Sequence, residues 1–163
     1  MEQPAGNKIT GNPSSHPALS VKWMEDFPDI PLNRNEAYKL RVTSKGVEIE
    51  AITETGVYRA IQTLRQLTEK KGNGIAITGC EITDWPAFRI RGFMQDVGRT
   101  YISTDELKRE IAILARYKIN VFHWHLTENQ AWRLQSKVFP MLNDSVNTTR
   151  QPGKYYTLAE ARE

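Results

Sequence analysis

Two stretches of alternating apolar and polar residues mark the first element that the chain predicts. Apolar side chains occupy every second position over 38–42 and again over 47–51, and Ser-Lys-Gly at 44–46 separates the two runs. Side chains two apart in a strand point to the same face, so each run has one apolar face. The pattern predicts a β-hairpin with one side buried.

The period of the apolar positions then changes from two residues to three or four. Val57, Ile61 and Leu64 recur at helical spacing, which predicts an amphipathic helix. Thr55 is the predicted N-cap. Gly72-Asn73-Gly74 is predicted to end the helix.

Hairpin, helix and one further short strand at Ile75 and Ile77 predict a small α+β domain over residues 20–83. Residues 1–19 before it are rich in Gly, Asn, Pro and Ser, and we expect a loosely ordered lead-in. The apolar residues of the domain are assigned to packing, and none of its residues suggests catalysis.

The second half of the chain has a strand–helix–strand pattern. Apolar runs at 90–96 and 119–126 flank an amphipathic helix predicted over 103–118. Ser103 and Glu106 have the spacing of a capping box at the start of this helix. A unit of this length is a parallel βαβ crossover.

Polar side chains gather just after both of these strands. Asp96 and Arg99 follow the first strand, and His125 and Glu128 follow the second. Sites in parallel sheets and barrels lie at the carboxyl ends of the strands, so we expect these four side chains to lie close together.

Arg99 and Glu128 have two interpretations on spacing alone. An arginine presents a planar fork of donors that suits two oxygens at once, such as the vicinal hydroxyls of a sugar, and Glu128 can accept a bond or take part in acid–base work. The same pair can also be an ion pair that only ties two loops together.

His123 and His125 point to the same side of one strand, so both imidazoles could ligate one metal ion. The alternative is a pair of inward-facing histidines hydrogen-bonded inside a barrel. Tryptophans can stack on sugar rings, but in a fold of this size they also serve packing. The three near the predicted site are Trp85, Trp124 and Trp132.

Composition excludes several classes of function. A net charge of +3 spread along 163 residues gives no basis for nucleic-acid binding. No apolar run reaches the roughly 18 residues needed to cross a bilayer, and residues 1–20 lack the apolar core of a signal peptide, so we expect no membrane partner and leave the localisation of the parent protein open. Cys80 is the single cysteine, so no internal disulfide is expected.

The chain after Trp132 reads as loop until residues 157–163, where a further capping-box pattern predicts the start of a helix. A helix that begins there has no core to cover within this sequence. We therefore expect the chain to be a fragment of a longer protein.

Four linked motifs give the chain a resemblance to a known family. They are Asp-Trp-Pro-Ala-Phe at 84–88, Arg-Gly-Phe-Met-Gln-Asp-Val-Gly-Arg at 91–99, Lys-Ile-Asn at 118–120, and His-Trp-His-Leu-Thr-Glu-Asn-Gln-Ala-Trp at 123–132. Together they resemble the β-N-acetylhexosaminidases of glycoside hydrolase family 20. The resemblance implies an accessory α+β domain followed, over residues 84–163, by the first strands and helices of an incomplete (β/α)₈ barrel.

The resemblance also implies roles for individual residues. Arg99 resembles the arginine that binds hydroxyls of the terminal N-acetylhexosamine. Glu128 stands where the family usually has an aspartate that orients a later histidine, and His125 resembles a histidine that supports the site from the barrel interior. Asp96 and Trp132, which belong to the same motifs, are predicted to support the site.

The implied reaction is removal of terminal N-acetylhexosamine from a glycan, with retention, by a substrate-assisted mechanism that is an exception to the two-carboxylate scheme. The resemblance implies no cofactor and no metal. The Asp-Glu pair that acts in the family comes from a fourth barrel strand. The Asp105-Glu106 dipeptide here reads instead as a helix start, so we expect this chain alone to be inactive. The alternatives are a metal-dependent barrel hydrolase with His123 and His125 as ligands, or a non-catalytic sugar-binding or structural piece.

Overall fold

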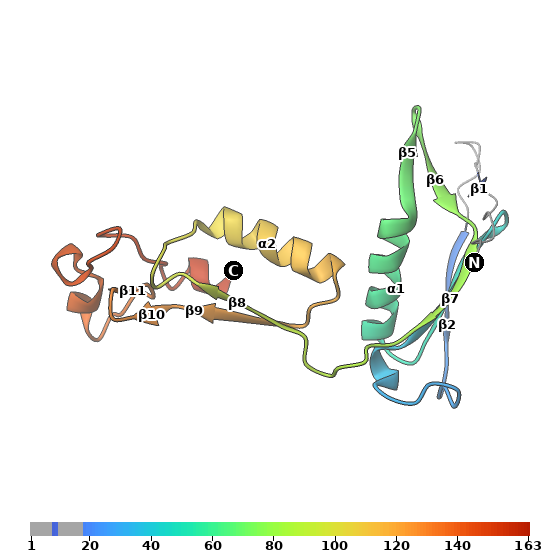
Figure 1. The fold of residues 1–163 in the computed structure, drawn as a ribbon, viewed down its shortest axis with the longest axis horizontal. Coiled ribbons are helices and arrows are strands. Elements are labelled where there is room, and N and C mark those ends of the chain that lie inside the picture. Colours follow the sequence, from blue (N-terminus) through green and yellow to red (C-terminus); the bar gives the residue numbers. More distant parts are fainter. Residues whose placement is uncertain (1–7, 10–17) are drawn as a thin grey trace, which may run out of the picture. The chain divides into compact units, whose positions relative to one another are not determined.

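The computed structural model describes residues 8–9 and 18–163, and the chain divides into two compact units between Arg89 and Ile90 (Figure 1). The first unit contains two small sheets and one long helix. The second contains a parallel strand pair joined by a helix, followed by loops and short turns of 3₁₀ helix. The prediction of a loosely ordered lead-in falls largely outside the described residues.

The main sheet of the first unit has the order β2-β4-β3-β7. Its strands are β2 (Ala18–Trp23), β3 (Tyr38–Thr43), β4 (Gly46–Ala51) and β7 (Cys80–Asp84). The antiparallel pairing of β3 with β4 confirms the predicted hairpin, with Tyr38 opposite Ala51. The pattern did not predict β2, which runs parallel to β4, or β7, which runs antiparallel to β3.

The core of this unit lies between the sheet and helix α1 (Glu54–Leu67), which covers β3 and β4 (Figure 1). The inward residues of the hairpin are buried together with Ala60 of the helix. They are Tyr38, Leu40, Val42, Val47, Ile49 and Ala51. Gly56 allows α1 to approach the backbone at Ala37, just before β3, because a Cβ at position 56 would lie 2.5 Å from the carbonyl oxygen of Ala37.

Both predicted ends of α1 were wrong. The N-cap is Thr53, whose hydroxyl accepts a hydrogen bond from the Gly56 N–H, and not Thr55. The helix ends at Leu67, where its apolar face ends, and not at residues 72–74. Residues after it instead pair as β5 (Thr68–Lys71) and β6 (Gly74–Thr78), which satisfies their backbone groups in a ladder. Gly72 takes the positive φ of 57° that the turn requires.

The strand at Ile75 and Ile77 is confirmed as part of β6. A two-residue strand, β1 (Lys8–Ile9), pairs with β6 on the side away from β5. A 3₁₀ turn, η1 (Arg34–Glu36), precedes β3.

The second unit confirms the predicted strand–helix–strand order. β8 (Gly92–Asp96) and β9 (Val121–His125) are parallel, and helix α2 (Thr104–Arg116) connects them. Each element is a few residues shorter than the apolar run that predicted it. The capping box is present, because the Ser103 hydroxyl accepts from the Glu106 N–H and the Glu106 carboxylate accepts from the Ser103 N–H.

Short elements complete the second unit. They are the hairpin of β10 (Thr127–Glu128) and β11 (Ala131–Trp132) and the 3₁₀ turns η2 (Pro140–Asn143), η3 (Ser145–Asn147) and η4 (Glu160–Arg162). The predicted contacts between Thr157 and Glu160 form, but a 3₁₀ turn follows them and not an α-helix. Val97, Leu107 and Tyr156 make a small core. In the part of the chain that the structure describes, no helix is both long enough and apolar enough to cross a bilayer.

Candidate active site

The carboxyl ends of β8 and β9 lie side by side, as the sequence predicted. Asp96 ends β8 directly opposite His125, which ends β9. Beyond Asp96 the chain turns, and the N–H groups of Val97 and Gly98 both donate to the carbonyl oxygen of His125, at 3.1 and 3.3 Å. The turn after Asp96 is therefore fixed to the end of β9, and Arg99 follows it at the carboxyl edge of the strand pair.

Arg99 bridges the two strand ends with its guanidinium group. Nη1 donates to Asp96 Oδ2 at 2.6 Å, and Nη2 donates to Glu128 Oε1 at 2.9 Å. The side chain is 56% exposed. Among the described residues only Asp96 and Glu128 accept from this guanidinium, so three of its five N–H donors remain for a ligand.

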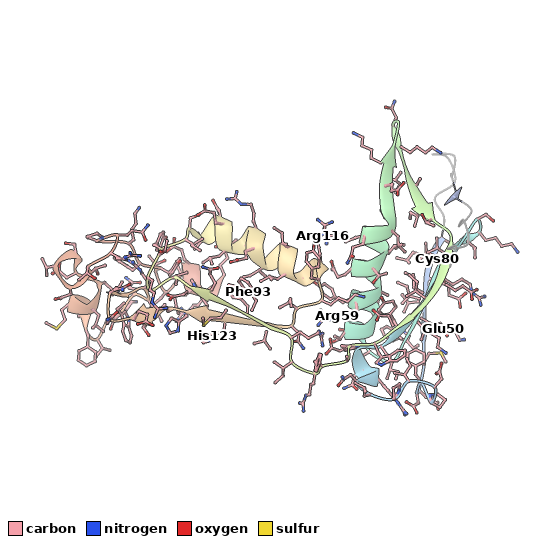
Figure 2. All side chains as sticks on the ribbon, viewed as in Figure 1. Glu50, Arg59, Cys80, Phe93, Arg116 and His123 are labelled. Carbon is pink, nitrogen blue, oxygen red and sulfur yellow. The ribbon has the colours of Figure 1, made fainter. Side chains whose placement is uncertain are left out.

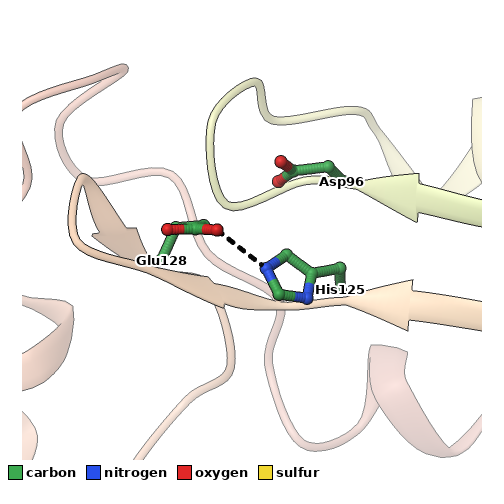
Figure 3. Close-up of side chains that lie close together, drawn as sticks. All are labelled: Asp96, His125 and Glu128. Atoms are coloured by element: carbon green, nitrogen blue, oxygen red, sulfur yellow. Dashed lines mark hydrogen bonds and ion pairs between the residues drawn. The ribbon is translucent and has the colours of Figure 1, made fainter.

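Glu128 is the centre of the cluster. Its Oε1 atom lies 3.2 Å from His125 Nε2 as well as accepting from Arg99 (Figure 3). The N–H of Asn129 bonds its other oxygen at 3.3 Å. Gly98 packs against this side chain so closely that a Cβ there would lie 2.9 Å from the Cβ of Glu128. The site thus depends on the glycine at position 98, within the motif at 91–99.

Both carboxylates are held in their charged form. The hydrogen bond from His125, then the Asn129 N–H and the charge of Arg99, lower the pKa of Glu128. Burial raises the pKa of Asp96, but the backbone N–H and guanidinium of Arg99 outweigh it and the net pKa is lowered. Ionised carboxylates orient Arg99 well, whereas a general acid needs a raised pKa.

A metal site was the alternative prediction. Asp96, His125 and Glu128 have potential ligand atoms within 4.8 Å of one another (Figure 3), and within residues 8–9 and 18–163 they are the only such group. Arg99 donates to both carboxylates and so already supplies a positive charge to them. His123, on β9 (Figure 2), is not a member of the group; its ring stands edge-on to that of His125 at 5.6 Å.

The three tryptophans occupy different environments. Trp85 packs against the buried cluster of Phe27 and Ile30, and Trp124 stands edge-on to Tyr156 at 4.6 Å. Trp132 lies in β11 and is 40% exposed. Packing accounts for Trp85 and Trp124, so Trp132 is the one that could stack on a sugar.

Sequence reasoning missed Arg133, which has 0% exposure and donates to the carbonyl oxygens of the turn that carries Arg99. Its only sequence signal is an arginine between two apolar residues.

The Asp105-Glu106 dipeptide is part of a helix start, as predicted. The Glu106 carboxylate accepts bonds from the hydroxyl and the N–H of Ser103, at 2.6 and 3.0 Å, and these bonds lower its pKa. A carboxyl group used in this way is unsuited to donate a proton to a leaving group.

The second unit is a parallel βαβ unit with charged and polar side chains at the carboxyl ends of its strands, which is where α/β enzymes have their sites. The chain belongs to glycoside hydrolase family 20. Residues 4–85 match the model of glycosyl hydrolase family 20, domain 2, and residues 88–163 match the model of the family's catalytic domain. The family that the sequence motifs suggested is confirmed.

Relatives and solved structures agree with this assignment. The chain is 40% identical over 147 residues to the beta-hexosaminidase of Porphyromonas gingivalis, covering 82% of this chain and 19% of the relative. It is 37% identical over 150 residues to the beta-N-acetylhexosaminidase of Cellulomonas fimi, covering 90% and 30%. The structure of the β-N-acetylhexosaminidase from Bacteroides fragilis matches with a TM-score of 0.76 and 33% identity, over 88% of this chain and 29% of that one.

The chain spans 19% to 30% of the length of these relatives. The family's domain 2 and the beginning of its TIM-barrel catalytic domain account for the two units.

Proposed function

We propose that this chain is the N-terminal part of an exo-acting β-N-acetylhexosaminidase and that its second unit supplies one side of the sugar-binding site. The observation that supports this proposal is the Arg99 fork, held between the ends of two parallel strands with donors left for a ligand. The relatives are named beta-hexosaminidases, and one related structure, from Vibrio harveyi, contains N-acetylglucosamine.

In this proposal Arg99 binds the terminal N-acetylhexosamine of a glycan. Its free donors suit two neighbouring hydroxyl oxygens, because the guanidinium is planar and its N–H groups are fixed in a fork. Asp96 and Glu128 fix the plane of that fork from two sides. The sugar therefore meets a donor set whose orientation is determined before binding.

Glu128 takes the place of the family's aspartate. Its extra methylene lets one oxygen serve Arg99 and His125 at the same time. We assign His125 and Asp96 to positioning, and Trp132 to an exposed apolar surface beside the site on which a sugar ring can stack.

The remaining chemistry is assigned to chain outside these residues. In the substrate-assisted mechanism that the family implies, the acetamido oxygen of the substrate attacks the anomeric carbon while a carboxylic acid protonates the leaving oxygen. Glu106 is committed to a helix cap, and the ionised Glu128 and Asp96 orient Arg99. The 163 residues are therefore expected to hold substrate groups without cleaving the bond.

We further propose that β8 and β9 are the first two strands of a (β/α)₈ barrel that this chain does not complete. Parallel sheets occur almost only with both faces covered. Here the two strands leave large apolar side chains exposed, among them Met94 on β8 and Val121 on β9.

Kinetics of the full-length protein test the activity. Release of p-nitrophenol from p-nitrophenyl N-acetyl-β-glucosaminide should be measurable, and Arg99→Ala should lower kcat/KM by about 10² to 10³, the effect of about two charge-assisted hydrogen bonds. The matched control is Arg41→Ala, an exposed arginine paired with Glu81 in the first unit, which should stay within about twofold of the wild type. No release by the wild type would refute the proposed activity, and equal effects of the two variants would refute the role of Arg99.

The Asp96, His125 and Glu128 group supports one other candidate, a metal-dependent hydrolase. Dialysis of the full-length protein against a chelator separates the two. The proposed glycosidase should keep its activity, whereas a metal enzyme should lose it and regain it when a divalent cation is added.

A further inference from the structure

Arg133 is a buried cation whose hydrogen-bond partners among the described residues are all uncharged. It is fully buried, and in the part of the chain that the structure describes no carboxylate pairs with it. Burial lowers the pKa of its guanidinium, which is the expected cost of removing a charge from water. An unpaired buried charge costs several kcal/mol unless other groups compensate for it.

The compensation comes entirely from backbone carbonyl groups. Nε donates to the oxygen of Val97 at 2.9 Å, and Nη2 donates to that of Gly98 at 3.2 Å. The other three bonds reach the segment 150–154, with Nη2 to Arg150 at 2.8 Å and Nη1 to Gln151 at 3.2 Å and to Lys154 at 2.7 Å. All five N–H donors of the guanidinium are used, which no other side chain can reproduce.

Two successive peptide groups before Arg99 are thereby held at both ends. In the peptide group between Val97 and Gly98, the Gly98 N–H donates to the carbonyl oxygen of His125, and the Val97 oxygen accepts from Arg133 Nε. In the peptide group between Gly98 and Arg99, the Arg99 N–H donates to Asp96 Oδ1 at 3.0 Å, and the Gly98 oxygen accepts from Arg133 Nη2. Rotation of either peptide plane would break a bond on each side.

The same guanidinium joins this turn to a distant segment. The N–H of Tyr101, two residues beyond Arg99, donates to the side-chain oxygen of Gln151, and the Tyr101 ring lies under the Lys154 ammonium group at 5.9 Å. The segment 150–154 is therefore joined to the turn and to Tyr101 both through the Arg133 guanidinium and through the Gln151 side chain.

We propose that Arg133 is a positioning residue for sugar recognition: it fixes the backbone from which Arg99 presents its fork. The inference rests on the proposed function for its ligand, but its structural part concerns the turn alone. Arg133 lies behind Arg99 and makes no contact with substrate in this account. Its effect on sugar binding is transmitted through the carbonyl groups of Val97 and Gly98.

The kinetic test uses Arg133→Lys in the full-length protein. Lysine keeps the charge but offers three donors, so at least two carbonyl groups lose their partner. Misplacement of Arg99 should raise KM for the p-nitrophenyl substrate at least tenfold and change kcat less than threefold, because uniform binding is lost. A loss of folded protein alone would lower the apparent kcat and leave KM unchanged.

A matched control and a double variant sharpen this test. Arg59→Lys replaces the buried arginine of α1 (Figure 2), which pairs with Glu36 in the first unit, and should leave KM within twofold. In an Arg99→Ala background, Arg133→Lys should raise KM no further, because the group that it positions is gone. A KM within twofold of wild type in Arg133→Lys, or an undiminished rise in the Arg99→Ala background, would overturn the inference.

Hydrogen exchange tests the turn independently of activity. In Arg133→Lys the amides of Val97, Gly98 and Arg99 should exchange at least tenfold faster than in wild type, and in Arg59→Lys less than twofold faster. Unchanged exchange in Arg133→Lys would overturn the inference even if KM rises. If these amides exchange faster in Arg133→Lys but the full-length wild type releases no p-nitrophenol, the two claims separate. The proposed glycosidase activity would be refuted, and the role of Arg133 in fixing the turn would stand.

A measurement on the wild type covers the case in which Arg133→Lys does not fold. If Arg133 fixes the turn in advance, saturating N-acetylglucosamine should slow exchange of these three amides less than twofold. A slowing of more than tenfold would show that the sugar orders the turn, and the inference would fail.

Discussion

The two units of the chain bury their helices to different extents. In the first unit α1 lies on a four-stranded sheet, and seven residues of sheet and helix form a buried cluster. In the second unit α2 lies with only two strands, Leu107 is its single buried residue, and Ile113 on the same helix is 53% exposed. Both helices are amphipathic and capped at the N-terminus, so the difference lies in what each helix has to cover.

The two units also differ in where their polar side chains gather. The first unit has its core within its own hairpin and helix, and side chains of its sheet form largely exposed ion pairs of the kind that contribute little stability, such as Lys22 with Glu50 and Arg41 with Glu81. The second unit has less buried apolar surface, but its strand ends carry the only described group of two carboxylates and a histidine with converging ligand atoms. Its order depends on polar contacts such as those of Arg133.

The largest expected contrast concerns core truncation. Ile49→Ala, at a fully buried position of β4, should lower the free energy of unfolding by about 3 to 4 kcal/mol through lost burial and a cavity. Ile113→Ala on α2 should change it by no more than about 0.5 kcal/mol. Urea unfolding of the 163-residue chain, followed by circular dichroism, measures both. Equal losses of stability in the two variants would mean that Ile113 is as well packed as Ile49, and the contrast between the units would fail.

The next effect concerns the glycine at the site. Gly98→Ala should lower the free energy of unfolding by about 1 to 3 kcal/mol, because the new methyl group meets Glu128 at 2.9 Å. Gly74→Ala is the control, since its nearest neighbour is 3.8 Å from the added Cβ. Thermal unfolding of the two variants measures the difference. A Gly98→Ala protein as stable as the control would show that Glu128 can move aside freely.

The helix caps should show a smaller and similar effect in the two units. Ser103→Ala removes a capping box from α2, and Thr53→Ala removes a single cap from α1. Each should cost about 1 kcal/mol. The unfolding midpoint in urea reports both values, and a Ser103→Ala variant indistinguishable from wild type would argue against an ordered α2 in solution.

Acid should affect the second unit more than the first. The pKa values of Asp96, Glu106, Glu128 and Glu160 are all lowered in the folded unit, by partners that only the folded state provides. A lowered folded pKa means stability that is present above the unfolded pKa, about 3.9 for aspartate and about 4.3 for glutamate, and is lost as the pH falls through the folded pKa. Hydrogen exchange between pH 6 and pH 3 should show residues 90–163 losing protection first. Loss at the same pH in both units would contradict this.

The sequence predicted the elements in which a repeating pattern and local chemistry agree. The hairpin of β3 and β4, the βαβ unit and the Ser103 capping box all appear, because period and caps are encoded within each segment. Asp96, Arg99, His125 and Glu128 came together because the ends of adjacent parallel strands share one edge.

The missed features depend on partners distant in sequence. β7 is short and has only two apolar residues, Cys80 and Ile82, and it is paired with β3 along its length. β5 continues directly from the end of α1, so only its ladder with β6 distinguishes it from a longer helix. Arg133 could not be predicted, since its five acceptors are backbone carbonyls from segments up to 36 residues away.

The most direct test of the account is a crystal structure of the full-length protein with N-acetylglucosamine. We predict that two ring hydroxyl oxygens lie within hydrogen-bond distance of the Arg99 guanidinium, with Asp96 and Glu128 still paired to it. A sugar bound elsewhere, or an Arg99 that stays paired only with the two carboxylates while the sugar is bound, would contradict it.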